Sequence, residues 1–140
     1  MKDHLPRVSI GLPVYNGEDY LAEAVDSILA QTFEAFELIL SDNASTDATE
    51  EICRGYETQD PRVRYFRSPT NRGAAWNYNN TVHMANSSEY FKWAAHDDTC
   101  APEYLRKCVE VLDRDPEVVL CHTTTIDIDA QGQFSGKTKP

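Results

Sequence analysis

The stretch Phe36-Glu37-Leu38-Ile39-Leu40-Ser41-Asp42-Asn43-Ala44-Ser45-Thr46-Asp47, residues 36–47, is an apolar run that turns abruptly polar. Its first half, 36–40, has the length and apolar character of a short buried strand. Its second half, 41–47, consists of residue types that favour turns and helix starts. The stretch therefore predicts a buried strand that ends in a polar loop, and the same succession recurs along the chain.

Strand-like and helix-like patterns alternate on both sides of this stretch. Apolar residues in the helical segments fall at helical spacing, and Asp47 followed by Glu50 has the form of a capping box for the second helix. Pro102 fits the first position of the last helix. The predicted elements are strands 8–12, 36–40, 62–66, 89–95 and 118–121, with helices over 18–30, from about 47, over 74–85 and from 102.

This alternation predicts an α/β fold with a mainly parallel central sheet and helices on both faces. Ile126 and Ile128 are expected to continue it as an edge strand. In sheets of this kind, ligands bind beyond the carboxyl ends of the strands. Polar residues that follow strands are therefore the first candidates for a site.

The composition limits the classes of partner. A formal net charge of −10 argues against binding nucleic acid, which requires clustered Lys and Arg. A ligand carrying phosphate would need local compensation from a cation or a helix N-terminus. No membrane-spanning run or signal peptide is evident, so a cytoplasmic location is expected. The four cysteines show no C-x-x-C spacing and are expected to be free thiols.

Three polar clusters follow predicted strands, at 13–17, 41–47 and 96–99. In the third, the adjacent carboxylates of Asp97 and Asp98 repel each other unless a positive charge lies beside them. A hard divalent cation, shared with substrate phosphates, would supply it. The alternative is a solvated turn before the next helix, and His96 alone is as well explained by a structural role.

The first two clusters and one loop supply candidate nucleotide contacts. The carboxylate of Asp42 could accept a hydrogen bond from a base or ribose, but it could equally form a turn or cap a helix. Tyr15 could stack on a base or be a core aromatic residue. Arg72, beside the flexible Gly73, could meet a diphosphate or be a solvated loop residue.

A phosphate-binding loop at 132–138 is rejected, because three residues rather than four separate its glycines and no helix can follow. A sugar nucleotidyltransferase has a similar sheet but normally carries a glycine-rich loop with Arg or Lys after its first strand. Pro13-Val14-Tyr15-Asn16 is not such a loop, so this class of enzyme is disfavoured.

In family order and roughly family spacing, the chain resembles the family 2 glycosyltransferases, which have the Rossmann-like GT-A fold. The resemblance extends from residue 7 to about 121. The matching segments are 8–16, Tyr20-Leu21, 27–32, 36–47, Asn71-Arg72-Gly73, Asn79, 90–98 and Pro102-Glu103-Tyr104-Leu105.

The resemblance implies transfer of a sugar, with inversion, from a nucleotide-diphosphate sugar to an acceptor hydroxyl. UDP is the implied carrier, Mg²⁺ or Mn²⁺ the implied cofactor, and the acceptor is an unknown saccharide, lipid or protein. By this resemblance Asp98 is the metal ligand and Asp97 contacts ribose or supports the metal. Asp42 binds the base, with Pro13 and Tyr15 on the neighbouring loop, and Arg72 lines the nucleotide site.

Two features depart from the family pattern. His96 replaces the first acidic residue of the D-x-D motif, and Asn43 stands where a second Asp is common. The family's catalytic base lies well beyond this motif, so it is expected beyond residue 140. Residues 1–140 therefore resemble a truncated, nucleotide-sugar-binding part. The alternatives are a non-catalytic or partner-dependent nucleotide-binding domain, and a peripheral contact with the inner membrane face stays open.

Overall fold

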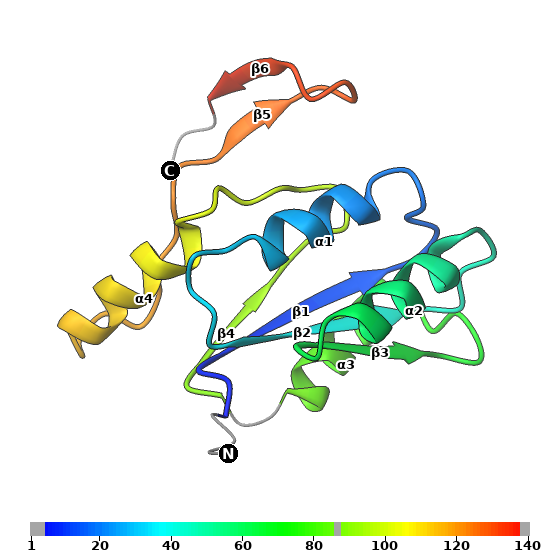
Figure 1. The fold of residues 1–140 in the computed structure, drawn as a ribbon, viewed down its shortest axis with the longest axis horizontal. Helices are drawn as coiled ribbons and strands as arrows, with labels where there is room; N and C mark the ends of the chain where they lie inside the picture. The colour runs from blue at the N-terminus through cyan, green and yellow to red at the C-terminus, as the bar shows by residue number, and fades with distance from the viewer. Residues whose placement is uncertain (1–4, 86–87, 138–140) are drawn as a thin grey trace.

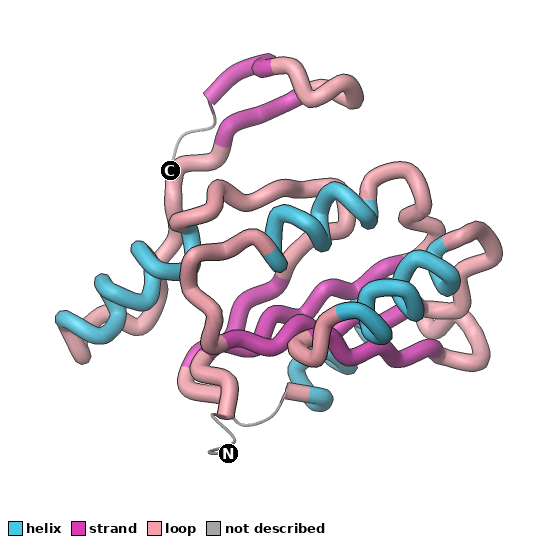
Figure 2. Tube along the Cα trace, viewed as in Figure 1, coloured by secondary structure: helices cyan, strands magenta, loops and turns pink. Residues whose placement is uncertain are grey.

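A computed structural model describes residues 5–85 and 88–137 (Figure 1). Helices and strands alternate along most of the chain, as the tube in Figure 2 shows. The elements in order are β1 (Val8–Val14), α1 (Leu21–Leu29), β2 (Phe36–Asp42), α2 (Thr49–Gln59), β3 (Val63–Arg67), α3 (Ala74–Met84), β4 (Tyr90–Trp93), α4 (Tyr104–Arg114), β5 (Ile126–Ile128) and β6 (Phe134–Lys137). No helix of the described residues is long and apolar enough to cross a membrane.

The first four strands form one parallel sheet in the order β3-β2-β1-β4. The register aligns Val14 with Asp42, and Asp42 with Arg67, so β1, β2 and β3 end at the same level. β4 ends opposite Gly11, earlier than its neighbour, and the loop after it passes the end of β1. The predicted parallel α/β architecture is confirmed.

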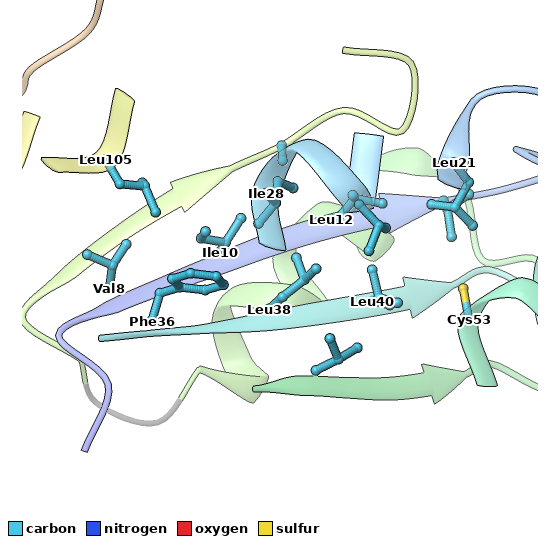
Figure 3. Packing of buried hydrophobic residues seen from close by; sticks show 14 of the residues in the cluster. Val8, Ile10, Leu12, Leu21, Ile28, Phe36, Leu38, Leu40, Cys53 and Leu105 are labelled. Carbon is cyan, nitrogen blue, oxygen red and sulfur yellow. The ribbon is translucent and has the colours of Figure 1, made fainter. Parts of the chain in front are cut away.

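One face of the sheet carries the apolar core (Figure 3). Alternate residues of a strand point to the same face, and on β1 these are Val8, Ile10, Leu12 and Val14, all nearly inaccessible to solvent. They cluster with the buried side of α1 and with residues of β2, α2 and α4. Each fully buried aliphatic side chain contributes about 1.5–3 kcal/mol, so this layer holds the strands in register.

The opposite face is covered by α3 and is polar. Gly11 makes room for the helix, because a Cβ there would collide with Thr81. The buried amide of Asn77 donates to the carbonyls of Val14 and Ser41 and accepts the Ser41 hydroxyl, thereby tying the ends of β1 and β2 together. The Asn-rich segment is thus a helix, and its asparagine side chains form hydrogen bonds with residues at the ends of β1 and β2.

The prediction of a strand at 118–121 is wrong. An apolar run forms a strand only where a neighbouring strand pairs with it, and within the described chain these residues pair with none. Val119 is 92% exposed and Leu120 77%. Ile126 and Ile128 do lie in a strand, β5, but it pairs antiparallel with β6 in a separate two-stranded sheet instead of extending the main one.

Three predicted helix starts are also shifted. α1 begins at Leu21 instead of residue 18. α2 begins at Thr49, and Glu50 forms no capping box because its carboxylate pairs with Arg54 and Arg67. Asp47 instead accepts the backbone N–H of Thr49. α4 begins at Tyr104, two residues after Pro102.

Candidate functional site

The loops after β1 and β2 are joined by a set of hydrogen bonds at the carboxyl edge of the sheet. Each loop supplies both donors and acceptors, so neither can move without the other. The bonds run from Asn16 N–H to Ser45 Oγ (2.9 Å), Gly17 N–H to Thr49 Oγ1 (2.9 Å), Glu18 N–H to Asp47 Oδ2 (3.1 Å), Thr46 N–H to Asn16 Oδ1 (2.8 Å) and Ala48 N–H to Glu18 Oε2 (2.9 Å). Side chains of this edge therefore stand on a rigid base.

Asp42, at the end of β2, is fully buried. Its carboxylate accepts the Ser45 backbone N–H at 2.8 Å and the Tyr65 hydroxyl at 2.9 Å, and the Arg67 guanidinium lies 3.4 Å away. Burial and the hydrogen bond to Asp42 raise the pKa of Tyr65 well above its usual range, so the phenol stays a donor. The structure thus gives Asp42 a turn-forming role, and its carboxylate is not exposed to solvent.

Asn43 points the other way and positions the loop before α3. Its amide nitrogen donates to Asn71 Oδ1 at 2.9 Å and to the Gly73 carbonyl at 3.2 Å, while its oxygen accepts the Arg72 backbone N–H at 2.9 Å. An aspartate here could not make the two donor contacts. Replacement of the common Asp by Asn43 therefore has a structural reason in this chain.

Arg72 is exposed, and its guanidinium stacks over the Trp76 ring at 4.2 Å from the centroid. The contact fixes the cation at the N-terminus of α3, where helix backbone N–H groups also favour anions. Trp76 in turn packs near Phe66 of β3, with ring centroids 6.5 Å apart.

Tyr15, immediately after β1, is 46% exposed and its ring is available to a ligand. Pro13 is buried within β1, in register with Ser41, so its ring does not face solvent.

The acidic loop after β4 lies against the loop after β1. A Cβ on Gly17 would come within 2.8 Å of the His96 ring, which shows that these two residues are in close contact. Asp97 and Asp98 follow and are both exposed. His96 thus acts as the point of contact, while the two carboxylates remain free to meet a ligand.

The carboxylates of Asp97 and Asp98 could supply only part of the coordination shell of a divalent cation. The described residues contain no group of three His, Cys, Asp or Glu side chains that could hold a metal ion. Mg²⁺ and Mn²⁺ sites at phosphates use one or two carboxylates, with phosphate oxygens and water completing the shell. Exposed Asp97 and Asp98 fit that pattern.

Asp97 also lines a cleft of about 220 Å³ beside Tyr20, Glu23 and Asp129. Asp42, Tyr15 and Arg72 are not among the residues that line this cleft. The site residues thus share the carboxyl edge of the sheet, but the cleft does not join them all.

Sequence reasoning missed several residues that organise this edge: Tyr65, Arg67, Asn77 and Trp76. Only Arg67 offered a signal, because a charged residue ending a half-buried strand often pairs with a neighbouring carboxylate. The others look like ordinary strand or helix positions until the chain is folded. The cysteine prediction is confirmed, since all four thiols are free.

A parallel α/β sheet with carboxylates, an arginine and an exposed aromatic residue at its carboxyl edge belongs to the ligand-binding α/β class. Comparison with known proteins narrows this class. The family model described as Glycosyl transferase family 2 matches residues 9–138, and the chain belongs to this family.

Its relatives agree with this assignment. The chain is 37% identical over 125 residues to an uncharacterized glycosyltransferase of Rickettsia typhi, covering 87% of this chain and 38% of the relative. It is 34% identical over 128 residues to glycosyltransferase GlyG of Streptococcus pneumoniae, covering 91% and 42%. The chain therefore spans less than half the length of these relatives.

Solved structures show the same GT-A fold. S. aureus TarS 1–349 in complex with UDP superposes with a TM-score of 0.71 at 27% identity, over 77% of this chain and 32% of that one. The mannosyltransferase PcManGT of Pyrobaculum calidifontis, in complex with GDP-Man and Mn²⁺, superposes with a TM-score of 0.72 at 28% identity, over 81% and 34%.

Proposed function

We propose that this chain is the nucleotide-sugar-binding part of a metal-dependent family 2 glycosyltransferase that transfers a sugar to an acceptor hydroxyl with inversion. The observation that carries the proposal is that exposed Tyr15, Arg72, Asp97 and Asp98 all follow strands at the carboxyl edge of one sheet, on loops joined by hydrogen bonds. The TarS and PcManGT structures support a nucleotide-sugar donor, since they hold UDP and GDP-Man.

Each candidate residue has a separate role that follows from its chemistry. Tyr15 offers a ring to the base, and Arg72 with the N-terminus of α3 offers positive charge to the diphosphate. Asp98, supported by Asp97, would hold Mg²⁺ or Mn²⁺, which supplies charge stabilisation for the departing diphosphate. Pro13 shapes the strand from within, and Asp42 keeps the loop in place while its contact with the base remains a prediction.

Uridine diphosphate is the proposed carrier, and a saccharide, lipid or protein hydroxyl the proposed acceptor. A cytoplasmic location, with or without a peripheral membrane contact, belongs to the same proposal. The deciding experiment is calorimetric titration of UDP, GDP and their sugar conjugates with and without Mn²⁺. Binding that requires the metal supports the proposal, whereas absence of binding to every nucleotide overturns it.

A second candidate is a nucleotide-binding domain that transfers sugar only with a partner. The observation in its favour is that the cleft lined by Asp97 includes none of Tyr15, Asp42 and Arg72. Measuring donor hydrolysis and transfer to an acceptor in separate assays distinguishes the two. Donor binding without either reaction favours the second candidate, and transfer by the chain alone excludes it.

A further inference from the structure

Three of the four cysteines gather around one tyrosine on the side of α4 that meets β4. Cys100 lies in the loop before α4, Cys108 on the helix and Cys121 in the segment after it. Burial, and then the three neighbouring thiols, raise the pKa of Tyr104 to about 12. Lys92 of β4 reaches the same group, with its ammonium 3.8 Å from the Cys100 sulfur and 4.7 Å from the centre of the Tyr104 ring. The thiols therefore form one cluster.

The chain after α4 turns back along the helix and brings Cys121 to the level of Cys108. The backbone N–H of Val118 donates to the Asp115 carbonyl at 3.0 Å, which closes a turn just after the last residue of the helix, Arg114. The helix rises about 9 Å from Cys108 to Arg114. The chain from Val118 to Cys121 can span about 10 Å when extended, so the two distances match. Figure 1 shows this returning segment beside α4.

The thiols of Cys108 and Cys121 contact each other. Burial, and next a hydrogen bond with the Cys121 thiol, raise the pKa of the Cys108 thiol to about 11. Cys108 is 8% exposed, whereas Cys121 is only partly buried. Val119 and Leu120, which precede Cys121, are exposed. Cys121 therefore turns inward from an exposed segment and meets a buried thiol on the helix.

The chemistry open to this pair is oxidation. Metal binding is disfavoured, since the described residues hold no group of three His, Cys, Asp or Glu side chains that could bind a metal ion. Two thiols in contact can form a disulfide once their side chains rotate to bring the sulfurs to about 2.05 Å. In a reducing compartment such bonds are usually transient and sense the redox state.

We propose that Cys108 and Cys121 form a reversible disulfide by exchange with a small-molecule disulfide such as oxidised glutathione. Cys121 is the more accessible thiol, so its thiolate attacks one sulfur of the small disulfide, breaks the S–S bond and releases one small thiolate. The Cys108 sulfur then loses its proton, attacks the Cys121 sulfur and releases the second small thiolate. Two protein thiols are thereby oxidised, and one small disulfide is reduced to two thiols that take up the two protons. The link would fasten the segment that leads to β5 onto α4, and it does not depend on the proposed function.

The test treats the reduced 140-residue chain with oxidised glutathione, in buffer and in urea, and then blocks the remaining thiols with N-ethylmaleimide. Trypsin places Cys53, Cys100, Cys108 and Cys121 on four different peptides, because Lys or Arg residues separate them. Mass spectrometry therefore identifies every pairing. Cys108→Ser and Cys121→Ser each remove one partner. Cys100→Ser is the matched control, since it removes a thiol of the same cluster and keeps the pair.

In buffer we expect peptides 108–114 and 115–137 to be linked in the unsubstituted chain and in Cys100→Ser, and dithiothreitol should separate them. The oxidised chain should melt roughly 5–10 °C higher than the reduced chain, because the link restricts the unfolded state. Cys108→Ser should retain one glutathione on Cys121, because the second step is blocked. Cys121→Ser should leave the buried Cys108 unmodified, and this variant keeps the test decisive if Cys108→Ser does not fold.

Urea separates the effect of the fold from the effect of chain proximity. In the unfolded chain the shorter loop between Cys100 and Cys108 closes at least as readily as the loop between Cys108 and Cys121, so we expect a mixture of links there. A dominant link between Cys100 and Cys108 in buffer overturns the proposal. The same pairing in urea as in buffer overturns it as well, and so does the absence of any link at every ratio of oxidised to reduced glutathione.

Discussion

The Tyr65 hydroxyl donates a 2.9 Å hydrogen bond to the buried carboxylate of Asp42, which joins β3 to the end of β2 beneath the loop that leads to α2. This contact makes two roles of Asp42 separable, because Tyr65 belongs to the structural role alone. We expect Tyr65→Phe to lower the free energy of unfolding by about 1.5–3 kcal/mol, the usual value for a hydrogen bond to a charged group. The ratio of UDP to GDP affinity should stay unchanged.

Asp42→Asn should destabilise the fold to a similar degree and also lower the UDP-to-GDP ratio, if the carboxylate reads the base. Urea denaturation gives the stability, and calorimetry gives the ratio. Equal loss of UDP and GDP affinity in Asp42→Asn and Tyr65→Phe would show that Asp42 acts only by supporting the loop.

Gly17 sets the distance between the first loop and the acidic loop. A Cβ at this position would lie 2.6 Å from Val14 and 2.8 Å from the His96 ring, so Gly17→Ala must displace one of them. We expect a loss of about 1–3 kcal/mol in stability and weaker Mn²⁺-dependent nucleotide binding. Gly55→Ala is the control, since nothing lies within 4 Å of its added Cβ, and within α2 it should stabilise by about 0.5–1 kcal/mol. Unaltered binding in Gly17→Ala would contradict a role in nucleotide binding for the contact between Gly17 and His96.

Ala44 adopts a left-handed backbone conformation, with φ of 66°, in the turn after Asp42. A Cβ in this region costs roughly 1–2 kcal/mol, and glycine avoids the cost. Ala44→Gly should therefore raise the melting temperature. A lower melting temperature would show that alanine stabilises the protein more, by restricting the unfolded chain, than it destabilises the protein through backbone strain in the turn.

Asp47 should make stability at the site depend on pH. Burial raises its pKa, but hydrogen bonds from Thr49 and Glu18 outweigh burial and hold the pKa below its ordinary value of 3.8. A carboxyl with a lowered folded pKa stabilises the native state above its unfolded pKa, and this stability is lost as pH falls through the folded pKa. Asp47→Asn should therefore cost more stability at pH 7 than at pH 3.

Asp113 provides the comparison, because hydrogen bonds from Arg7 and Tyr90 lower its pKa far from the carboxyl edge. Asp113→Asn should show the same trend of stability with pH. Only Asp47→Asn should also weaken nucleotide binding, since Asp47 joins the first two loops. Identical binding by the two variants would count against a role for the joined loops.

Asp98→Ala should abolish metal-dependent binding of nucleoside diphosphates while leaving the fold intact, because Asp98 is exposed. Asp97→Ala tests the neighbouring carboxylate, and Glu51→Ala on α2 serves as the control. Calorimetry with Mn²⁺ measures the affinity and circular dichroism the fold. Unchanged affinity in Asp98→Ala removes the metal assignment from that residue, and a loss in Asp97→Ala alone would transfer it to Asp97.

The local sequence was sufficient to predict the strands and helices whose own apolar pattern shows which face is buried. The buried run at 36–40 and the helical spacing after Tyr20 each require one apolar face to be covered, and the parallel sheet supplies that cover. The run at 118–121 is also apolar but has no pairing partner in the described chain, so pattern alone could not distinguish it from a strand.

The amino-acid sequence by itself determined the parallel α/β architecture and the position of polar residues after strands, because both follow from short-range periodicity. Only the tertiary structure decided which of these residues face a ligand. Asp42 and Asn43 are adjacent in the chain, yet one carboxylate is enclosed by Tyr65 and Ser45 while the other side chain anchors Arg72. Successive residues of a strand point to opposite faces of the sheet, and what covers each face is set by segments distant in the sequence.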